Sequence, residues 1–396
     1  MLNVLTGLGL LGLLVVHPPQ AEARAIARHL PAGAPVAQPA LSTTRLAVAP
    51  EVANKPLLAP APPNLRGAVP VGKGMWIWLP QYSEGGNAAA IVAKAQHYGI
   101  NYLYVRTGSS VTGFQGADFL NALLPLAHQA GIKVYGWDFP YLDNIEADVG
   151  RASQAAHYTT PSGDRIDGFA ADIEFRSMGV NLAGDTTSWY GHLLRDRLGF
   201  GYPLIAVVPR PTAVSTRIYP YATVVPMFDA IAPMVYWLNN DPAQAVQQAF
   251  AYLNQFGKPI IPVGQAYDGA PEGGPAGVPN RGSILRFIGA SADAGATSVS
   301  FWSWQAATDE VWQAVSDAAM FQVPVGDHAT YRPDQIRSFQ MLLTSLGFGV
   351  TPTGLWGADM DAAVKAFQTA ARVQPTGQID VATRELLMRP VAPPLK

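Results

Sequence analysis

The sequence has no cysteine and little charge. Without cysteine the chain cannot form a disulfide, use a thiol nucleophile or hold a thiolate-bound zinc ion. Charged residues make up 14% of the chain, its formal net charge is -2, and it has no long basic run. Such a chain lacks the positive surface that attracts nucleic acids and anionic membranes. We therefore expect neither of these partners.

Three common catalytic motifs are also missing. The histidines are scattered, with no H-E-x-x-H or comparable spacing that would hold a zinc ion. No G-x-S-x-G elbow presents a nucleophilic serine, and no glycine-rich phosphate loop follows the first predicted strand. We expect no metal and no cofactor, so any catalysis must use other side chains.

The longest apolar segment lies at the start of the chain. Residues 4–16, VLTGLGLLGLLVV, are followed by small residues around Ala21 and Ala23, which is typical of a secretory leader. The run is shorter than the ~20 residues of a membrane span. We predict a leader over residues 1–23 and a secreted protein, extracellular or associated with the cell wall. An uncleaved anchor or a buried segment is the alternative.

Alanine and proline dominate the segment after the leader. Residues 24–72 show no sustained helical or strand period, and repeated proline removes backbone donors. We predict an extended, poorly ordered linker there, with a small ordered subdomain as the alternative.

Eight short apolar runs follow, separated by segments long enough for a helix. Two of these segments end at Gly99 and Gly131, and glycine suits the residue after a helix. Eight strand and helix pairs predict an α/β fold, a (β/α)8 TIM barrel over residues 73–322, with a doubly wound open sheet as the alternative. The runs are GMWIWLP, NYLYVRTG, KVYGWDFP, IDGFAADIEF, PLIAVVPR, AIAPMVYW, PIIPVGQAYD and SVSFWSWQ.

The fourth run carries two carboxylates two residues apart. Because residues i and i+2 of a strand point to the same face, Asp172 and Glu174 share a face. Two like charges side by side are costly in a dry core, whereas a site at the carboxyl end of a barrel strand can use their raised pKa values. We predict an active site here. The alternative is that the carboxylates cap loops or pair with Arg176 or Arg210.

Other polar and aromatic side chains are expected at the same end of the barrel. Asp138 and Gln265 end predicted strands, where they could bind sugar hydroxyl groups. Tryptophans that face the mouth can stack on sugar rings, but alternation along a strand sends about half of them into the core. The candidates are Trp76, Trp78, Trp137, Trp237, Trp302 and Trp304.

The pattern becomes helical after a short linker over residues 323–330. Apolar residues recur at helical spacing from Ile336 to Leu346 and again from Met360 to Phe367. We predict a small all-α domain of three helices over residues 331–390.

This C-terminal segment resembles the peptidoglycan-binding-like domain of bacterial cell-wall hydrolases. The resemblance rests on FQMLLTSLGF, TGLWG, AAVKAFQ and TGQIDVATRELL, in which Gly354 and Gly377 mark similar turns 23 residues apart. It departs at Asp361, roughly where the family prefers threonine. The resemblance implies binding of wall glycan or stem peptide, with the contact expected near Trp356.

The barrel segment resembles the chitinase-like glycoside hydrolases of family 18. The family's fourth strand reads D-x-x-D-x-D-x-E, and residues 167–174, DGFAADIE, keep three of these four acids, with Ala170 in place of the second. The family's sixth-strand M-x-Y-D corresponds to residues 234–237, MVYW, with Trp237 in place of the aspartate.

This resemblance implies roles for three residues. Glu174 would be the acid and base, Asp172 would orient a substrate acetamido group, and Tyr236 would donate a hydrogen bond to that group. We expect a monomeric enzyme that cleaves a β-linked, N-acetylated polysaccharide such as peptidoglycan or a chitin-like polymer. Because Ala170 and Trp237 replace two carboxylates of the family, two alternatives stay open: a noncatalytic glycan-binding protein, and a hydrolase of another exopolysaccharide.

Overall fold

The computed structural model describes residues 69–318, residues 326–331 and most of residues 336–386. Within the last range, residues 337, 338, 341, 342, 345, 352, 381, 382, 384 and 385 are not described. The predicted leader, most of the predicted linker over residues 24–72 and part of the linker over residues 323–330 lie outside the described residues.

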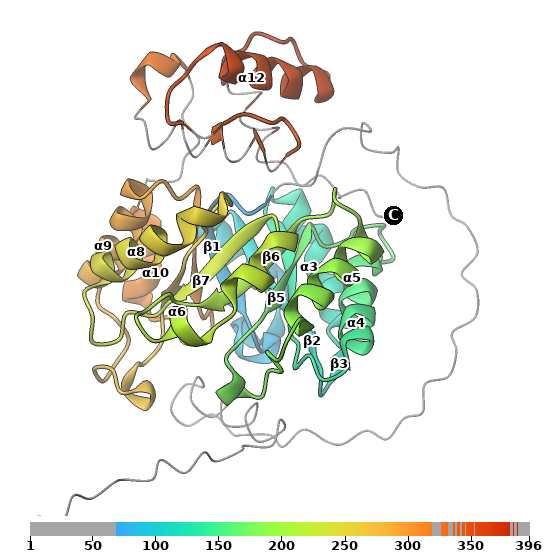
Figure 1. Ribbon diagram of the computed structural model, residues 1–396, viewed down its shortest axis with the longest axis vertical. Helices are drawn as coiled ribbons and strands as arrows, with labels where there is room; N and C mark the ends of the chain where they lie inside the picture. The colour runs from blue at the N-terminus through green and yellow to red at the C-terminus, as the bar shows by residue number, and fades with distance from the viewer. Residues whose placement is uncertain are drawn as a thin grey trace, which may run out of the picture.

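Eight parallel strands close into a barrel, as the apolar runs predicted (Figure 1). Neighbouring strands are hydrogen-bonded around the ring, and β1 pairs with both β9 and β2, so the alternative of an open sheet is wrong. Strands buried on both faces read as nearly continuous apolar runs, which is why the pattern was visible in the sequence. The strands are β1 (Gly72–Ile77), β2 (Tyr102–Ser109), β4 (Lys133–Phe139), β5 (Gly168–Asp172), β6 (Leu204–Pro209), β7 (Ala230–Val235), β8 (Val263–Gln265) and β9 (Ser298–Trp302).

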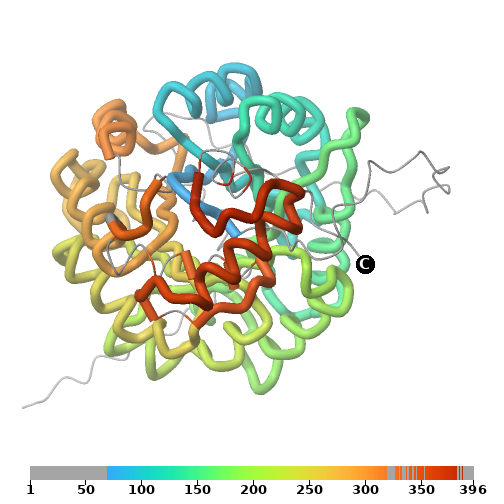
Figure 2. The backbone as a smooth tube through the Cα atoms, turned by 90° about the horizontal axis from the view of Figure 1, so that it is seen from above, coloured from blue at the N-terminus to red at the C-terminus, as the bar shows by residue number. Residues whose placement is uncertain are grey.

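Helices surround the barrel, as the view from above shows (Figure 2). The side chain of Asn87 begins the first of them by accepting a hydrogen bond from the Ala90 amide at 3.1 Å. Gly99 and Gly131, just beyond two helices, have φ values of 66° and 72°, the left-handed region in which glycine is favoured. No helix of the described residues is long and apolar enough to span a membrane. The main helices are α2 (Ala88–His97), α3 (Ala117–Gln129), α4 (Ile145–His157), α5 (Thr186–Leu198), α8 (Pro242–Leu253), α9 (Arg281–Asp293) and α10 (Asp309–Asp317).

Two connections differ from the simple alternation of strand and helix. After β2, the short strand β3 (Gly113–Phe114) turns back and pairs antiparallel with the end of β2. After β6, two single-turn helices, α6 (Ser215–Ile218) and α7 (Tyr221–Val224), replace one long helix. Pro220 separates these two helices, and a proline inside a longer helix would break its hydrogen bonding.

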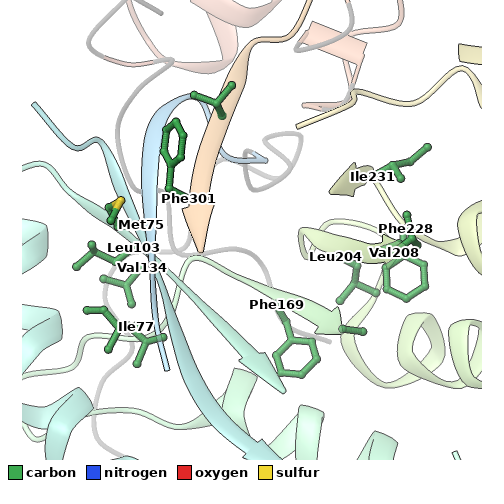
Figure 3. Packing of buried hydrophobic residues seen from close by; sticks show 14 of the residues in the cluster. Met75, Ile77, Leu103, Val134, Phe169, Leu204, Val208, Phe228, Ile231 and Phe301 are labelled. Atoms are coloured by element: carbon green, nitrogen blue, oxygen red, sulfur yellow. The ribbon is translucent and has the colours of Figure 1, made fainter. Parts of the chain in front are cut away.

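The barrel has an outer and an inner layer of buried side chains. Met75 and Leu103 point outward and pack with the apolar faces of the helices (Figure 3). Trp76 and Tyr104, from the same two strands, point inward and stack with their ring centroids 4.0 Å apart. The inner layer closes the middle of the barrel, so a ligand can enter only from an end.

The C-terminal region is helical and contains the predicted repeat. Its longest helix among the described residues is α12 (Ala358–Ala370). Gln340 accepts a hydrogen bond from the Gly354 amide at 2.8 Å, and Gln368 accepts one from the Gly377 amide at 2.8 Å. The two glycines have φ values of 79° and 80°. The same glutamine-to-turn contact thus occurs twice.

The C-terminal region and the carboxyl ends of the strands lie at opposite ends of the barrel. Figure 1 shows α12 above one end, whereas β3 and α6, which follow the carboxyl ends of β2 and β6, lie at the other. α12 therefore does not cover the end of the barrel at which the strands present their active-site loops.

Candidate active site

The two carboxylates of the fourth run line one cavity at the carboxyl end of β5. Asp172 is the last residue of β5, Ile173 is buried in the outer layer, and Glu174 follows on the same side as Asp172. The cavity has a volume of about 450 Å³. Asp172 is almost fully buried there, and Glu174 is partly exposed. The predicted geometry of the pair is therefore present.

Within the described residues, neither carboxylate is locked to the two arginines that the alternative named. The Arg176 side chain is exposed and donates a hydrogen bond to the Leu182 carbonyl at 2.7 Å. The terminal Nη1 of Arg210 is buried without a hydrogen-bond partner. Asp172 Oδ1 is likewise buried with no partner, so it is available to a ligand.

Eight aromatic side chains line the cavity. Trp302 lies at their centre, with its ring 5.4 Å from Trp137, 5.6 Å from Trp78 and 5.9 Å from Trp76. Flat apolar rings of this kind suit the apolar faces of sugars. The aromatic lining residues are Trp76, Trp78, Trp137, Phe139, Tyr141, Phe175, Tyr236 and Trp302.

Trp237 and Trp304 lie outside the cavity, contrary to the prediction that they contact substrate. Trp237 follows the inward-facing Tyr236, so alternation turns it outward, where its ring lies 5.4 Å from Phe287. Trp304 comes after the end of β9, where the strand period no longer holds, and its ring lies 4.6 Å from Trp312 in the outer layer.

Asp138 and Gln265 also lie behind the cavity wall rather than in it. Asp138 is fully buried, and its Oδ2 accepts a hydrogen bond from Arg151 Nε at 2.7 Å. Gln265 accepts a hydrogen bond from the Leu238 amide at 3.1 Å and donates one to the Tyr267 carbonyl at 3.2 Å. The side-chain amide of Gln265 is therefore used within the protein, and Asp138, whose Oδ1 is buried without a hydrogen-bond partner, is fully buried. Neither residue lines the cavity, where the prediction placed both of them against sugar hydroxyls.

Burial and like charges raise the pKa of both site carboxyls. Burial, helped by the charge of Glu272, raises the pKa of Glu174 to about 7. Burial and the charges of Glu174 and Asp138 raise the pKa of Asp172 well above its usual value, and Arg106 only partly opposes this. The pair therefore holds a proton near neutral pH.

Tyr236 completes the predicted group of three in the same cavity. Its ring lies 5.3 Å from the ring of Tyr267. Burial, together with the neighbouring Tyr267 and the charges of Asp172 and Glu174, raises the pKa of its hydroxyl well above the usual value. The hydroxyl stays protonated and can donate a hydrogen bond to a ligand.

Three charged lining residues were not predicted as site residues: Arg106, Arg210 and Glu272. The arginines stand at the ends of the second and fifth apolar runs, so the reasoning that selected Asp172 would also have found them. Glu272 lies in the glycine-rich loop after β8, where no period marks it, and accepts a hydrogen bond from the Tyr267 hydroxyl at 2.8 Å. No cluster of three or more acidic or histidine side chains suited to a metal occurs among the described residues.

Trp356 is held within the C-terminal region. Its Nε1 donates a hydrogen bond to Asp361 Oδ1 at 2.7 Å, and its ring stacks on His328 with centroids 4.5 Å apart. The ring is partly exposed, and the neighbouring Leu355 is 69% exposed. The departure at Asp361 therefore has a structural role, because its carboxylate orients the tryptophan.

Comparison with known proteins identifies the C-terminal segment. Residues 332–387 match the family described as "Putative peptidoglycan binding domain". No curated protein matches the chain.

Solved structures of carbohydrate-active enzymes are among the structural matches. A chitinase from Chromobacterium violaceum is 14% identical, with a TM-score of 0.44, and the match covers 62% of this chain and 98% of that one. The spore cortex-lytic enzyme SleL from Bacillus cereus is 13% identical, with a TM-score of 0.46, and the match covers 62% of this chain and 73% of that one. The endo-1,4-beta-mannanase from Rhizomucor miehei is 10% identical, with a TM-score of 0.44, and the match covers 59% of this chain and 86% of that one. These similarities are too low to transfer an activity.

The observed fold and the family match agree with the two resemblances found in the sequence. The chain combines a closed (β/α)8 barrel, the fold expected for a chitinase-like protein, with a C-terminal segment that matches a peptidoglycan-binding family.

Proposed function

We propose that this protein is a secreted, cell-wall-associated glycoside hydrolase that cleaves a β-linked, N-acetylated polysaccharide such as peptidoglycan or a chitin-like polymer. One observation carries the proposal: Asp172 and Glu174 line a single aromatic cavity, and neither is held in an ion pair within the described chain. The match of residues 332–387 supports the cell wall as the place of action.

Glu174 is the proton donor in this proposal. Cleavage of a glycosidic bond requires an acid that protonates the leaving oxygen while positive charge develops at the anomeric carbon. With a pKa of about 7, Glu174 is protonated in about half of the molecules at neutral pH and releases its proton readily. After the bond breaks, Glu174 is the base that removes a proton from the attacking water.

Asp172 and Tyr236 act on the substrate acetamido group. The unpartnered Oδ1 of Asp172 accepts a hydrogen bond from the acetamido N–H, and Tyr236 donates one to the group, so that its carbonyl oxygen faces the anomeric carbon. That oxygen forms a bond to the anomeric carbon as the bond to the leaving oxygen breaks, and water then opens the cyclic intermediate. For a sugar without an acetamido group, Asp172 would itself be the nucleophile or would stabilise the charge.

The environment of Asp172 favours the enzyme over a noncatalytic binding protein. Ala170 removes one carboxylate from β5, but Asp138 on the neighbouring β4 lies close enough for its charge to raise the Asp172 pKa. The charge of a second acid, which lies behind the cavity wall and is bonded to Arg151, therefore acts on Asp172 from another strand. This electrostatic coupling supports the enzyme proposal.

The test compares wild type with Glu174→Gln on insoluble cell walls, chitin oligomers and an exopolysaccharide, and counts new reducing ends. The matched control is Glu146→Gln, a glutamate on the exposed surface of α4. We expect product from wild type and the control, loss of product by at least about 100-fold in Glu174→Gln, and retained binding. Binding without product that is equal in wild type and Glu174→Gln would establish the noncatalytic alternative.

A further inference from the structure

Arg210 is a charged residue of the cavity wall that the proposed reaction does not use. It directly follows β6 and lies three residues beyond Val207, which pairs with Asp172 on β5. Its carbonyl accepts a hydrogen bond from Ser215 Oγ at 2.7 Å, and the same hydroxyl accepts one from the Thr212 amide at 2.6 Å. The loop after β6 therefore fixes the backbone of Arg210 on the strand next to the catalytic pair.

The guanidinium of Arg210 has no carboxylate partner among the described residues. Its Nη1 is buried and forms no hydrogen bond. Burial lowers the pKa of Arg210, and no carboxylate of the described chain opposes that effect. The side chain thus places a cation and a free donor in the cavity wall.

Other buried arginines of the barrel have carboxylates beside them. Arg151 Nε lies 2.7 Å from Asp138, and Arg195 Nη2 lies 2.6 Å from Asp229. Burial lowers the pKa of Arg106 to about 10, but nearby carboxylates oppose the decrease. Arg210 differs from these three because it lines the cavity and no nearby carboxylate among the described residues offsets its charge.

An uncompensated cation in a partly buried wall is costly unless a ligand supplies the opposite charge. The planar guanidinium matches a carboxylate, to which it can donate two parallel hydrogen bonds. The cavity also holds Asp172, Glu174 and Glu272, which would repel a doubly charged phosphate more strongly than a singly charged carboxylate. The balance of charges therefore favours a carboxylate.

We propose that Arg210 binds a carboxylate carried by the substrate, so that the preferred glycan contains an acidic sugar next to the bond that is cleaved. This inference rests on the proposed function for the position of the substrate. The carboxylate can belong to a lactyl ether, as on muramic acid that carries no stem peptide, or to a uronic acid. Both present the same monoanion to the guanidinium.

The Glu174→Gln variant is expected to turn substrate over slowly. In this variant the contribution of Arg210 to binding can therefore be measured separately from catalysis. Calorimetry would compare this variant with the double variant Glu174→Gln/Arg210→Met on three probes. Peptide-free wall glycan carries lactyl carboxylates, hyaluronan oligosaccharides carry uronic carboxylates, and chitin oligomers carry neither. The matched control is Arg217→Met in the same background, because Arg217 is exposed on α6 and lies outside the cavity lining.

We expect Arg210→Met to weaken binding of at least one acidic probe by about 10- to 100-fold, the loss typical of a charge-assisted hydrogen bond, and binding of chitin oligomers by less than about twofold. The acidic probe that loses affinity identifies the source of the carboxylate. Arg217→Met should change neither the binding of the acidic probes nor the binding of chitin oligomers. The melting temperature of Arg210→Met should equal or exceed that of its parent, because the variant removes an uncompensated cation rather than a structural contact.

Two results would overturn the inference: equal losses on acidic and neutral probes, or no preference of the parent for either acidic probe. Failure of the proposed function looks different. If wild type releases no product from any glycan but the preference that depends on Arg210 persists, the hydrolase proposal fails while the carboxylate site stands.

Discussion

Glu174 owes its raised pKa to burial and to the charge of Glu272, and the second cause can be removed by mutation. An acid must be protonated to act, so kcat/KM should fall about tenfold per pH unit above about pH 7. Glu272→Gln removes a like charge, which lowers the Glu174 pKa and moves this decline to lower pH. The measurement is the pH dependence of kcat/KM for wild type, Glu272→Gln and the surface control Glu146→Gln. An unmoved profile in Glu272→Gln would show that the two carboxyls do not interact.

Asp138 illustrates a residue whose buried partners decide its role. Arg151 lies 2.7 Å from Asp138 and 2.8 Å from Asp148, and all three side chains are buried. Arg151→Met should lower the free energy of unfolding by about 3–5 kcal/mol, since it leaves two carboxyls without their cation. Chemical denaturation measures this, with the exposed Arg217→Met as the control. A loss below about 1 kcal/mol would mean that the network contributes little to stability.

Sequence periodicity identified the carboxylate pair of the site but not Arg106, which lies on β2 and also lines the cavity. Asp172 and Glu174 were found because a strand alternates its faces, and the same rule explains why Tyr236 faces inward and Trp237 outward. Glu272 was missed because it lies in an aperiodic loop. The burial of Asp138 by Arg151 could not be predicted either, because it depends on where α4 packs against β4.

At the scale of elements, α3 is tied to the segment before β5 through a charged histidine. His128 lies 2.8 Å from Asp164 and 3.1 Å from Asp167. Burial alone would lower the His128 pKa, but the hydrogen bonds and charges of the two aspartates outweigh it and raise the pKa to about 9. The unfolded chain has a histidine pKa of about 6.5. The contribution to stability is therefore complete below about pH 6.5 and is lost as pH rises through about 9.

We expect the stability difference between wild type and His128→Gln to shrink by about 1–3 kcal/mol between pH 6 and pH 9.5. Denaturant unfolding of both proteins at the two pH values measures this. Burial lowers the pKa of nearby Lys133 to about 8. Because Lys133 is present in both proteins, its contribution to the pH dependence of stability cancels in the comparison. A constant difference across this range would contradict the ion pairs.

The strands were more predictable than the connections between them. All eight apolar runs became barrel strands, because strands covered on both faces need unbroken apolar sequence. The hairpin of β2 with β3 was not predicted, since the two residues of β3 are too few to form a pattern. The two short helices after β6 were likewise not predicted, because they depend on the backbone geometry of Pro220 rather than on a hydrophobic period in the sequence.

At the scale of the whole molecule, the segment that matches the peptidoglycan-binding family and the cavity lie at opposite ends of the barrel. A protein attached through the end that carries α12 would leave the mouth open to a glycan chain (Figure 1). Removal of residues 326–396 should reduce retention on insoluble walls by at least about tenfold, because tethering raises the local concentration of substrate. Cleavage of soluble oligosaccharides should be unchanged. Cosedimentation with walls and a soluble assay test the two parts, and unchanged retention would exclude a wall-binding role.

The central claim is that Glu174 protonates the leaving oxygen, and the dependence on the leaving group tests it most directly. A 4-nitrophenolate leaves without protonation, whereas a sugar hydroxyl needs an acid. The measurement is kcat/KM of wild type and Glu174→Gln on a 4-nitrophenyl glycoside and on the matching unsubstituted oligosaccharide. The account predicts a loss of at least about 100-fold on the oligosaccharide and less than about tenfold on the aryl glycoside. Equal losses on both substrates would contradict it.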